Sequence, residues 1–240
     1  MNGSHNRNVI KKISNEMKAM NQKNLEKKNG SPEAIYEEGK STTQLFVVPS
    51  LGIDPATGQE VFLTRNGEKT YIWDPLDKVA IGDTEPKLRG SISSAFTYKN
   101  WSVSLACSYE LGAWWYNQTL VDKVQDADLR GNVDRRVFEE RWQKPGDKVM
   151  FTKFGPGINA NATSLTKPTS RFIEDNNYLE LSTLNLSYEF GMPWMKKVGL
   201  KRLKVLFYMN DVFRASTVKQ ERGIDYPFAR NFSVGLQARF

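Results

Sequence analysis

The single histidine of the chain, His5, is the first side chain to test for acid–base or nucleophilic chemistry. It lies in a polar stretch of Asn, Gly and Ser, far from any segment expected to form a pocket, so we expect no Ser-His-Asp arrangement. The carboxylate pairs Glu139-Glu140 and Glu174-Asp175 are each two adjacent residues. On a strand, adjacent side chains point to opposite faces, so neither pair can present an acid and a base to one substrate.

The sequence also contains few side chains that could bind a metal ion or a cofactor. Cys107 is the only cysteine, which excludes an intrachain disulfide framework and a zinc site built from cysteines. No Gly-rich phosphate loop or metal-ligand cluster occurs in the sequence. The segment Asp54-Pro55-Ala56-Thr57-Gly58 lacks the spacing of an EF-hand, and its proline and glycine favour a turn. We therefore expect no catalytic residue, no metal and no cofactor, and the chain is not expected to be an enzyme.

Ligand binding is harder to exclude, because one segment, about 112–170, is rich in aromatic and cationic side chains. They are Trp114, Trp115, Tyr116, Arg135, Arg136 and Trp142. Such rings could stack on sugar rings or contact a partner protein. The favoured interpretation is structural, with the rings at a membrane interface or packed within the loop. No substrate-binding residue is named from the sequence, and the substrate-contacting residues are unknown at this stage.

The elements that would position these residues follow from hydropathy. No stretch approaches the ~18 apolar residues of a membrane-spanning helix, and the mean hydropathy is −0.55. A transmembrane barrel is compatible with these values, since only one face of each strand meets lipid. The net charge of +7 is spread along the chain, so we expect no nucleic-acid partner.

Long period-two alternation begins after residue 87. It predicts strands at about 88–99, 101–117, 172–190, 201–214 and 227–240. In the second of these, apolar side chains alternate from Trp101 to Leu111, a length sufficient to cross a bilayer at the tilt of a barrel strand. In the third, Leu179 and Leu181 are out of phase with Leu184, which predicts a bulge near Ser182.

The connections between the expected strands alternate in length. They are Lys99-Asn100, about 118–170, about 191–200 and about 215–226. Short turns on one side and long loops on the other are typical of transmembrane barrels. Four aromatic residues near strand ends are expected to lie at the membrane interface: Tyr98, Trp101, Tyr188 and Trp194. The predicted fold class is all-β, namely the C-terminal strands of a large antiparallel transmembrane β-barrel, incomplete in this chain.

The N-terminal region, residues 1–87, is expected to be a loop region beside these strands, which occupy 88–240. Ile10, Ile13, Met17 and Met20 recur at helical spacing and predict an amphipathic helix over about 8–28. A β-hairpin is expected at about 44–63, around the turn at Asp54.

The last predicted strand continues to Phe240, the final residue. Chain ends usually fray and end in polar residues, whereas here apolar side chains alternate back from the terminus. This pattern resembles the assembly signal of bacterial outer-membrane proteins. The residues that would form it are Phe232, Val234, Leu236, Ala238 and Phe240.

Short phrases along most of the chain are similar to the C-terminal portion of SusC/RagA-type TonB-linked (TonB-dependent) outer-membrane proteins. They include Tyr36-Glu37-Glu38-Gly39, Gly52-Ile53-Asp54-Pro55-Ala56-Thr57-Gly58, Gly82-Asp83-Thr84-Glu85-Pro86, Tyr98-Lys99-Asn100-Trp101, Arg141-Trp142-Gln143-Lys144-Pro145-Gly146-Asp147, Ser170-Arg171-Phe172-Ile173-Glu174-Asp175, Asn210-Asp211-Val212-Phe213 and Tyr226-Pro227 with Arg230. Each phrase alone is weak, and their order and spacing together carry the resemblance.

The resemblance implies nutrient uptake across the bacterial outer membrane, with glycans (polysaccharide utilisation) or peptides as cargo. It implies a SusD-like surface lipoprotein as partner, the TonB complex through an N-terminal part, the barrel-assembly machinery and a lipid bilayer. It also implies that the region before residue 88 and the loop at about 118–170 are extracellular. Transporters of this kind have roughly 22 strands and a plugged lumen.

The sequence supplies only about five such strands, without a signal peptide, TonB box or plug domain. An open sheet edge cannot sit in hydrocarbon, so we expect a fragment that does not transport alone. The alternative is a soluble or secreted β-rich carbohydrate-binding module. That alternative requires one strand face to be buried in a dry core, whereas the polar face is rich in Ser, Thr and Asn.

Overall fold

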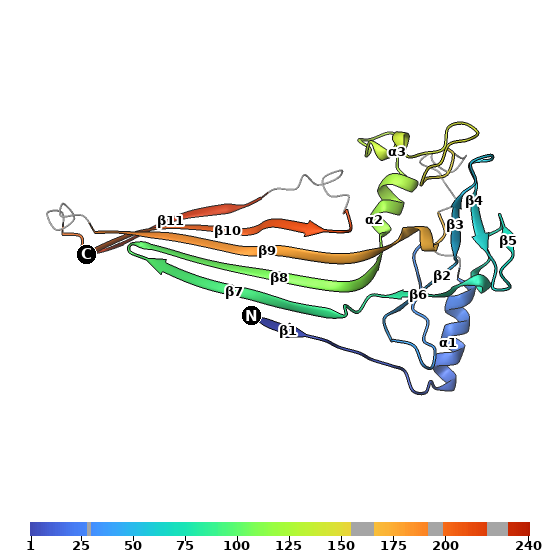
Figure 1. The fold of residues 1–240 in the computed structure, drawn as a ribbon, viewed down its shortest axis with the longest axis horizontal. Helices are drawn as coiled ribbons and strands as arrows, with labels where there is room; N and C mark the ends of the chain where they lie inside the picture. The colour runs from blue at the N-terminus through green and yellow to red at the C-terminus, as the bar shows by residue number, and fades with distance from the viewer. Residues whose placement is uncertain (28–29, 155–165, 192–198, 220–229) are drawn as a thin grey trace.

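A long antiparallel sheet extends from a globular end in this computed structural model, which describes residues 1–27, 30–154, 166–191, 199–219 and 230–240 (Figure 1). The strands of the sheet, in spatial order, are β1 (Asn2–Ser4), β7 (Leu88–Tyr98), β8 (Trp101–Tyr116), β9 (Ile173–Phe190), β10 (Arg202–Ser216) and β11 (Phe232–Arg239). The predicted all-β, antiparallel fold is confirmed, and the sheet is open, with β1 and β11 at its two edges. In the described part of the chain, no helix is long and apolar enough to cross a membrane.

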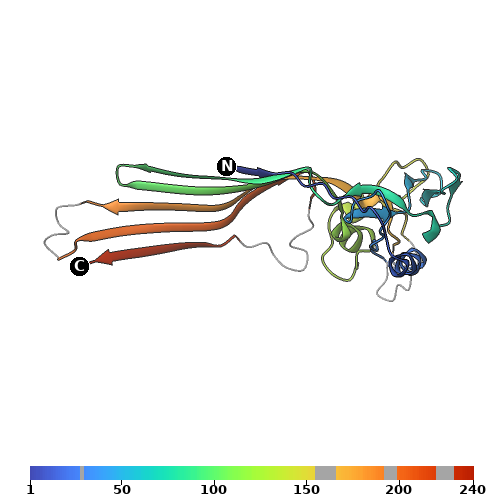
Figure 2. The same ribbon diagram turned by 90° about the horizontal axis from the view of Figure 1, so that it is seen from below.

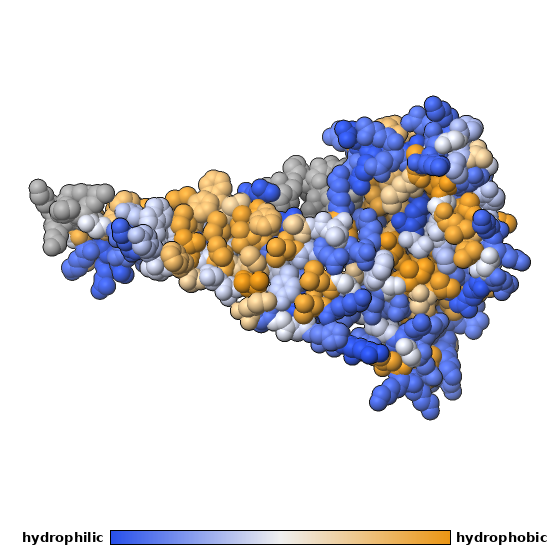
Figure 3. Space-filling view, viewed as in Figure 1, coloured by the Kyte–Doolittle hydropathy of each residue, from blue (hydrophilic) through white to orange (hydrophobic). Residues whose placement is uncertain are grey.

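The strand register gathers the apolar side chains on one face of the sheet. One row of cross-strand partners consists of Phe96, Val103, Leu186, Phe207 and Val234. The next row, one residue along each strand, consists of Ala95, Ser104, Asn185, Tyr208 and Ser233. Because a shift of one residue would move every side chain to the other face, this register separates an apolar face from a hydroxyl-rich face. Figure 3 shows the apolar side chains along the sheet.

A β-bulge lies at Ser182, as the sequence predicts. Ala106 of β8 pairs with Thr183, whereas the next residue, Cys107, pairs with Leu181, so Ser182 is the extra residue. The bulge changes the phase of β9, and Leu181 therefore joins the same apolar face as Leu184 despite their odd spacing.

The two ends of the sheet differ in their connections. The turn between β7 and β8 and the C-terminus lie at one end, which we call the turn end, and the helices lie at the other (Figures 1 and 2). Lys99 adopts a left-handed conformation (φ 53°) in this two-residue turn. Asn100 fixes the turn to β9, because its side chain donates to the Glu189 carbonyl (2.7 Å) and its own carbonyl accepts from Glu189 N (2.9 Å).

The globular end is built from short elements: α1 (Asn15–Glu26), β2 (Gln44–Val47), β3 (Ser50–Ile53), β4 (Glu60–Leu63), β5 (Lys69–Thr70), η1 (Pro75–Asp77), β6 (Val79–Asp83), α2 (Gln118–Leu120), η2 (Val121–Gln125), α3 (Arg136–Glu139) and η3 (Ser170–Phe172). Its core contains Val47, Tyr116, Leu120, Val121, Val124, Ala127, Val137, Phe151 and Phe172. These residues come from both predicted regions, so the expected division between 1–87 and 88–240 cuts through one packed body. Residues 2–4 also depart from that division, because β1 pairs with β7.

The predicted helix over about 8–28 is too long. The hydroxyl of Ser14 accepts from Met17 N and caps α1, which begins at Asn15. Its buried side chains are Asn21 and Asn24 rather than the predicted apolar row. Asn24 Nδ2 donates to the Ala34 carbonyl (2.8 Å), and Tyr36 N donates to Asn21 Oδ1 (2.9 Å). Helix α1 is therefore held by side-chain amides that bind the backbone of residues 34–36.

The predicted hairpin at about 44–63 is also too long. Strand β2 pairs with β6, and within residues 44–63 the hairpin consists of β3 and β4 alone. The turn between them matches the prediction around Asp54, because Gly58 N donates to the Asp54 carbonyl (2.8 Å) and Gly58 has φ 71°.

Candidate functional site

The side chains that the sequence singled out for acid–base chemistry lie apart from one another. His5 is exposed, and its Nδ1 lies 2.5 Å from the Lys87 carbonyl oxygen, to which it can donate. Within the described ranges, no group of three or more His, Cys, Asp or Glu side chains could hold a metal ion. The polar interactions that could form a binding site involve other residues.

Three aromatic rings from the segment 112–170 pack against loops. The Trp142 ring covers Gly58, where a Cβ atom would lie 2.5 Å from Trp142 Cδ2, and its indole N–H donates to the Pro55 carbonyl (2.8 Å). The Trp114 ring covers Gly82 in the same way. Tyr116 is 5 % exposed, and burial raises the pKa of its hydroxyl. These rings serve packing, which is the interpretation that the sequence favoured.

The two arginines of that segment form local ion pairs. Arg135 Nε lies 2.9 Å from Glu139 on the exposed side of α3. Arg136 Nε lies 3.0 Å from Asp134 Oδ1, and this hydrogen bond lowers the pKa of Asp134 to about 2. The arginines therefore shape the loop around α3.

The predicted interfacial aromatics gather on the apolar face near the turn end. The Trp101 and Tyr188 ring centroids are 4.7 Å apart, and Trp101 is the cross-strand partner of Tyr98. Tyr98 is 58 % exposed and Trp101 is 47 % exposed. Trp194 lies outside the described residues. The three described rings thus form a continuous aromatic border at one end of the apolar face.

The predicted assembly-signal residues lie on β11, at the edge of the sheet. Phe232, Val234 and Leu236 are each about two-thirds exposed on the apolar face, and Ala238 pairs with Leu203 of β10. Phe240 follows the strand and is 75 % exposed. Within the described residues, β11 pairs on one side only.

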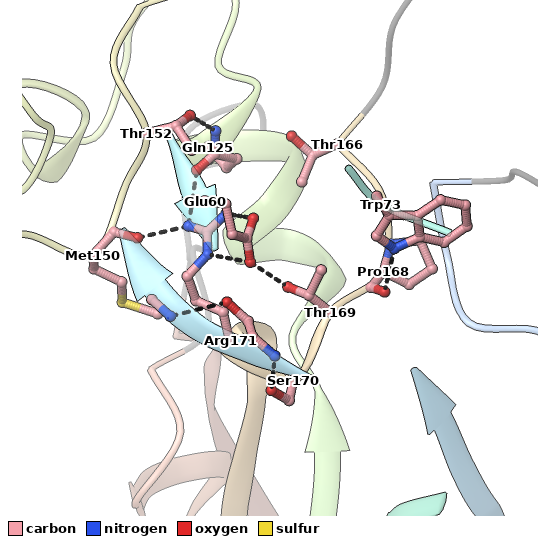
Figure 4. A network of polar contacts seen from close by, with 12 residues as sticks. Glu60, Trp73, Gln125, Met150, Thr152, Thr166, Pro168, Thr169, Ser170 and Arg171 are labelled. Atoms are coloured by element: carbon pink, nitrogen blue, oxygen red, sulfur yellow. Dashed lines mark hydrogen bonds and ion pairs between the residues drawn. The ribbon is translucent and has the colours of Figure 1, made fainter. Parts of the chain in front are cut away.

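A buried polar network lies in the globular end (Figure 4). Arg171 of η3 donates to both carboxylate oxygens of Glu60 in β4, at 3.1 and 2.8 Å, and the two side chains are 6 % and 8 % exposed. Arg171 also donates to Gln125 Oε1 (3.0 Å) and to the Met150 carbonyl (2.6 Å), while Thr169 donates to Glu60 (2.9 Å). One network therefore connects β4, η2, η3 and the segment around Met150, which follows α3.

Above this network lies a pocket of about 320 Å³. Its aromatic walls are Phe62, Tyr71 and Trp73, and Lys153 stands on its lining. Trp73 is fixed by its indole N–H, which donates to the Pro168 carbonyl (3.3 Å). Tyr71 donates to Asp54 Oδ2 (2.9 Å), and this bond raises the pKa of the Tyr71 hydroxyl.

Sequence reasoning did not find this pocket. Glu60, Tyr71 and Trp73 were not candidates, and Arg171 appeared only within a family-like phrase. Glu60 and Arg171 are 111 positions apart, so no local spacing could have predicted their contact.

Comparison with known proteins gives matches at the level of structure only. No family model matches the chain, and no curated protein matches it. The fold is similar to a solved structure of the RagAB peptide transporter, with a TM-score of 0.60 and 16 % sequence identity. The match covers 85 % of this chain and 23 % of the transporter chain. It is similar to the RagAB peptide importer in its open-open state (TM-score 0.60, 16 % identity, 85 % and 23 % covered). It is also similar to the closed-closed state (TM-score 0.59, 16 % identity, 84 % and 23 % covered).

The chain thus spans about a quarter of the length of these transporter chains. The likeness extends over most of the present chain, sheet and globular end included. The resemblance to SusC/RagA-type proteins that the sequence indicated is confirmed as a likeness of fold, and this chain has the fold of one part of a RagAB transporter chain.

Proposed function

We propose that this chain is the C-terminal part of a TonB-dependent outer-membrane transporter that imports glycans or peptides together with a SusD-like surface lipoprotein. The observation that carries the proposal is the register of the sheet, which aligns apolar side chains such as Phe96, Val103 and Leu186 in continuous rows on one face. The opposite face is hydroxylated. A sheet of this kind suits a barrel wall between lipid and a wet lumen.

The two ends of the sheet support an orientation. In this proposal the turn end, with its short turn and its aromatic border of Tyr98, Trp101 and Tyr188, faces the periplasm, and Trp194, which lies outside the described residues, is proposed as a further interfacial residue on sequence grounds alone. The globular end is extracellular and forms the surface on which the lipoprotein closes. Both cargo classes remain within the proposal, and the similarity of the fold to the RagAB peptide transporter supports the second.

Transport is a property of the longer parent. The sheet has two open edges at β1 and β11, and bacterial single-chain barrels begin at about eight strands. The parent's other strands close the barrel, its N-terminal part contacts the TonB complex, and the barrel-assembly machinery inserts it through the signal on β11.

The membrane-facing side can be tested directly. In a Cys107→Ala background of the parent, a fluorophore is attached to Val103→Cys or to Ser104→Cys, neighbours on opposite faces of β8. Brominated lipids should quench the label at residue 103, and an aqueous quencher should reach only the label at residue 104. Equal aqueous quenching at both positions, with a monomer stable in detergent-free buffer, would support the soluble carbohydrate-binding module instead.

Import itself is tested by uptake. Cells that carry the parent and its lipoprotein should accumulate a labelled oligosaccharide or a labelled peptide, and cells without the parent should not. Equal accumulation of both probes in the two strains would contradict the transport function.

A further inference from the structure

The pocket of the globular end is positively charged. Its titratable lining contains three cationic side chains, Lys153, Lys167 and Arg171, and one carboxylate, Glu60. Both oxygens of Glu60 accept from Arg171, so the guanidinium balances the charge of this carboxylate and the two lysines remain as the excess charge of the lining. A cavity with more cations than anions favours an anionic ligand.

The groups that remain available in the pocket are mostly donors. In the described part of the chain, Lys153 makes no ion pair and the Gln59 side chain makes no hydrogen bond. Thr152 accepts from Gln125 Nε2 (2.7 Å), which leaves the hydroxyl proton of Thr152 available for a ligand. Lys153 can therefore meet an anionic group while Gln59 and Thr152 meet neighbouring polar atoms.

The walls of the pocket provide flat apolar surfaces. Tyr71 is 53 % exposed and Trp73 is partly buried, and both are held by hydrogen bonds from their polar atoms, to Asp54 and to Pro168. The Tyr71 ring is thus fixed and half-exposed, whereas the Lys78 ammonium lies over one face of the Trp73 ring, 5.7 Å from its centroid, so that only the rest of this ring lines the pocket. Pockets that bind small ligands combine such aromatic walls with a few polar groups that set orientation, and their volumes start at about 300 Å³. The volume of about 320 Å³ suits a group the size of one ring.

We propose that this pocket binds an acidic sugar ring, a uronate residue of a glycan, with its carboxylate on Lys153 and one ring face on Tyr71 and Trp73. A sugar ring carries hydroxyls that both donate and accept, which matches the amide of Gln59 and the hydroxyl of Thr152. The inference rests on the proposed function for the source of the ligand, an extracellular glycan, while binding does not require import.

Binding is measured by calorimetry with the parent in detergent micelles and an α-1,4-linked galacturonate trisaccharide. The methyl ester of the same trisaccharide lacks the charge and keeps the shape, so it should bind about tenfold more weakly, as expected when a charge-assisted hydrogen bond is lost. Lys153→Gln should weaken the acidic trisaccharide by the same factor and leave the ester unchanged. Lys18→Gln, which removes an exposed lysine of α1, is the matched control and should change neither.

The aromatic contact is tested with two variants at one position. Tyr71→Leu removes the ring and should weaken both saccharides, whereas Tyr71→Phe keeps the ring, loses only the bond to Asp54 that fixes it and should weaken binding less than Tyr71→Leu does. Because the Lys153 side chain is exposed, Lys153→Gln keeps the test valid even where Tyr71→Leu disturbs folding.

Three results would overturn the inference. The first is equal binding of the acid and its ester, and the second is native affinity in Lys153→Gln. The third is tighter binding of the peptide Gly-Gly-Trp with a free carboxylate, lost in Lys153→Gln, which would make the pocket a peptide site. Failure of all saccharide binding in a chain whose residue-103 label still contacts lipid would reject this inference alone and leave the proposed transporter standing.

Discussion

The guanidinium of Arg171 and the carboxylate of Glu60 form a buried ion pair, with their closest atoms 2.8 Å apart. The pair joins β4 to η3, which directly precedes β9, and so connects two parts of the chain that are 111 positions apart. Thr169 and Gln125 occupy the remaining positions around it. The pair is therefore both the floor of the pocket and the link between the β3–β4 hairpin and the sheet.

Glu60→Gln should destabilise the globular end by about 3 kcal/mol, because removing one partner leaves a buried guanidinium without its counter-charge. Urea unfolding in detergent micelles, followed by tryptophan fluorescence, measures the loss. The control is Asp128→Asn, which breaks the exposed pair with Arg130 and should change stability far less, because solvent screens an exposed ion pair. An equal loss in the two variants would contradict the role assigned to the buried pair.

Gly58→Ala should be more damaging than Gly67→Ala. Both glycines have positive φ, 71° and 83°, so both substitutions carry a backbone cost of roughly 1–2 kcal/mol. Only at Gly58 would the new methyl group also meet the Trp142 ring, since nothing lies within 4 Å of the corresponding position at Gly67. Urea unfolding should show an additional loss of about 1–3 kcal/mol for Gly58→Ala. Similar values for the two variants would show that the ring moves aside freely.

Acid should weaken the loop around α3 through Asp134. The hydrogen bond from Arg136 lowers the pKa of Asp134 from its usual 3.8 to about 2. A lowered carboxyl pKa stabilises the fold fully above about pH 4, and this stabilisation, at most about 2 kcal/mol, is lost as pH falls towards 2. Stability measured between pH 5 and pH 2 should therefore fall less steeply in Asp134→Asn than in the native chain. Parallel curves would contradict the assignment.

Leu184→Arg should block membrane assembly of the parent, whereas Asn185→Arg should not. The two residues are neighbours in β9 and point to opposite faces of the sheet. An arginine on the lipid face near the bilayer centre costs about 2–4 kcal/mol, and one in a wet lumen costs little. The amount of folded parent in the outer-membrane fraction measures the effect. Equal loss for both variants would argue against the proposed lipid face.

Deletion of Phe240 should reduce the amount of parent in the outer membrane, because the terminal aromatic is proposed to be read by the assembly machinery. Phe240→Tyr keeps an aromatic ring at the exposed terminus and should assemble normally. Fractionation and immunoblotting measure both. Normal outer-membrane levels after the deletion would show that the terminal strand carries no assembly signal.

The long strands could be predicted from sequence because their alternation is local and extends over many residues. Even the bulge at Ser182 was visible, as a change of phase between Leu181 and Leu184. The helix was less accurately predicted. Its true start follows from the Ser14 cap, a local signal, but the burial of Asn21 and Asn24 follows from backbone partners that only the folded chain brings near.

Of the candidate sites, too, one could be predicted from local sequence patterns and the other could not. The positions of Tyr98, Trp101 and Tyr188 on one face follow from period-two alternation, so the sequence could place them. The pocket could not be placed, because Tyr71 and Lys153 come from segments that meet only through the Glu60–Arg171 pair and the loops around it. Pairings over long sequence separations, including that of β2 with β6, leave no periodic trace in the chain.

Strands β7 to β11 lie side by side in the order in which they occur along the chain. Each strand therefore needs only its predecessor as a template, and the sheet can grow by nearest-neighbour addition without threading any segment through a closed ring. The one long excursion, between β8 and β9, contributes most of the apolar core of the globular end. If this segment between β8 and β9 folds early, it shortens the effective loop that must close before β9 pairs with β8. The entropy cost of that closure, which would otherwise slow formation of the sheet, is then smaller.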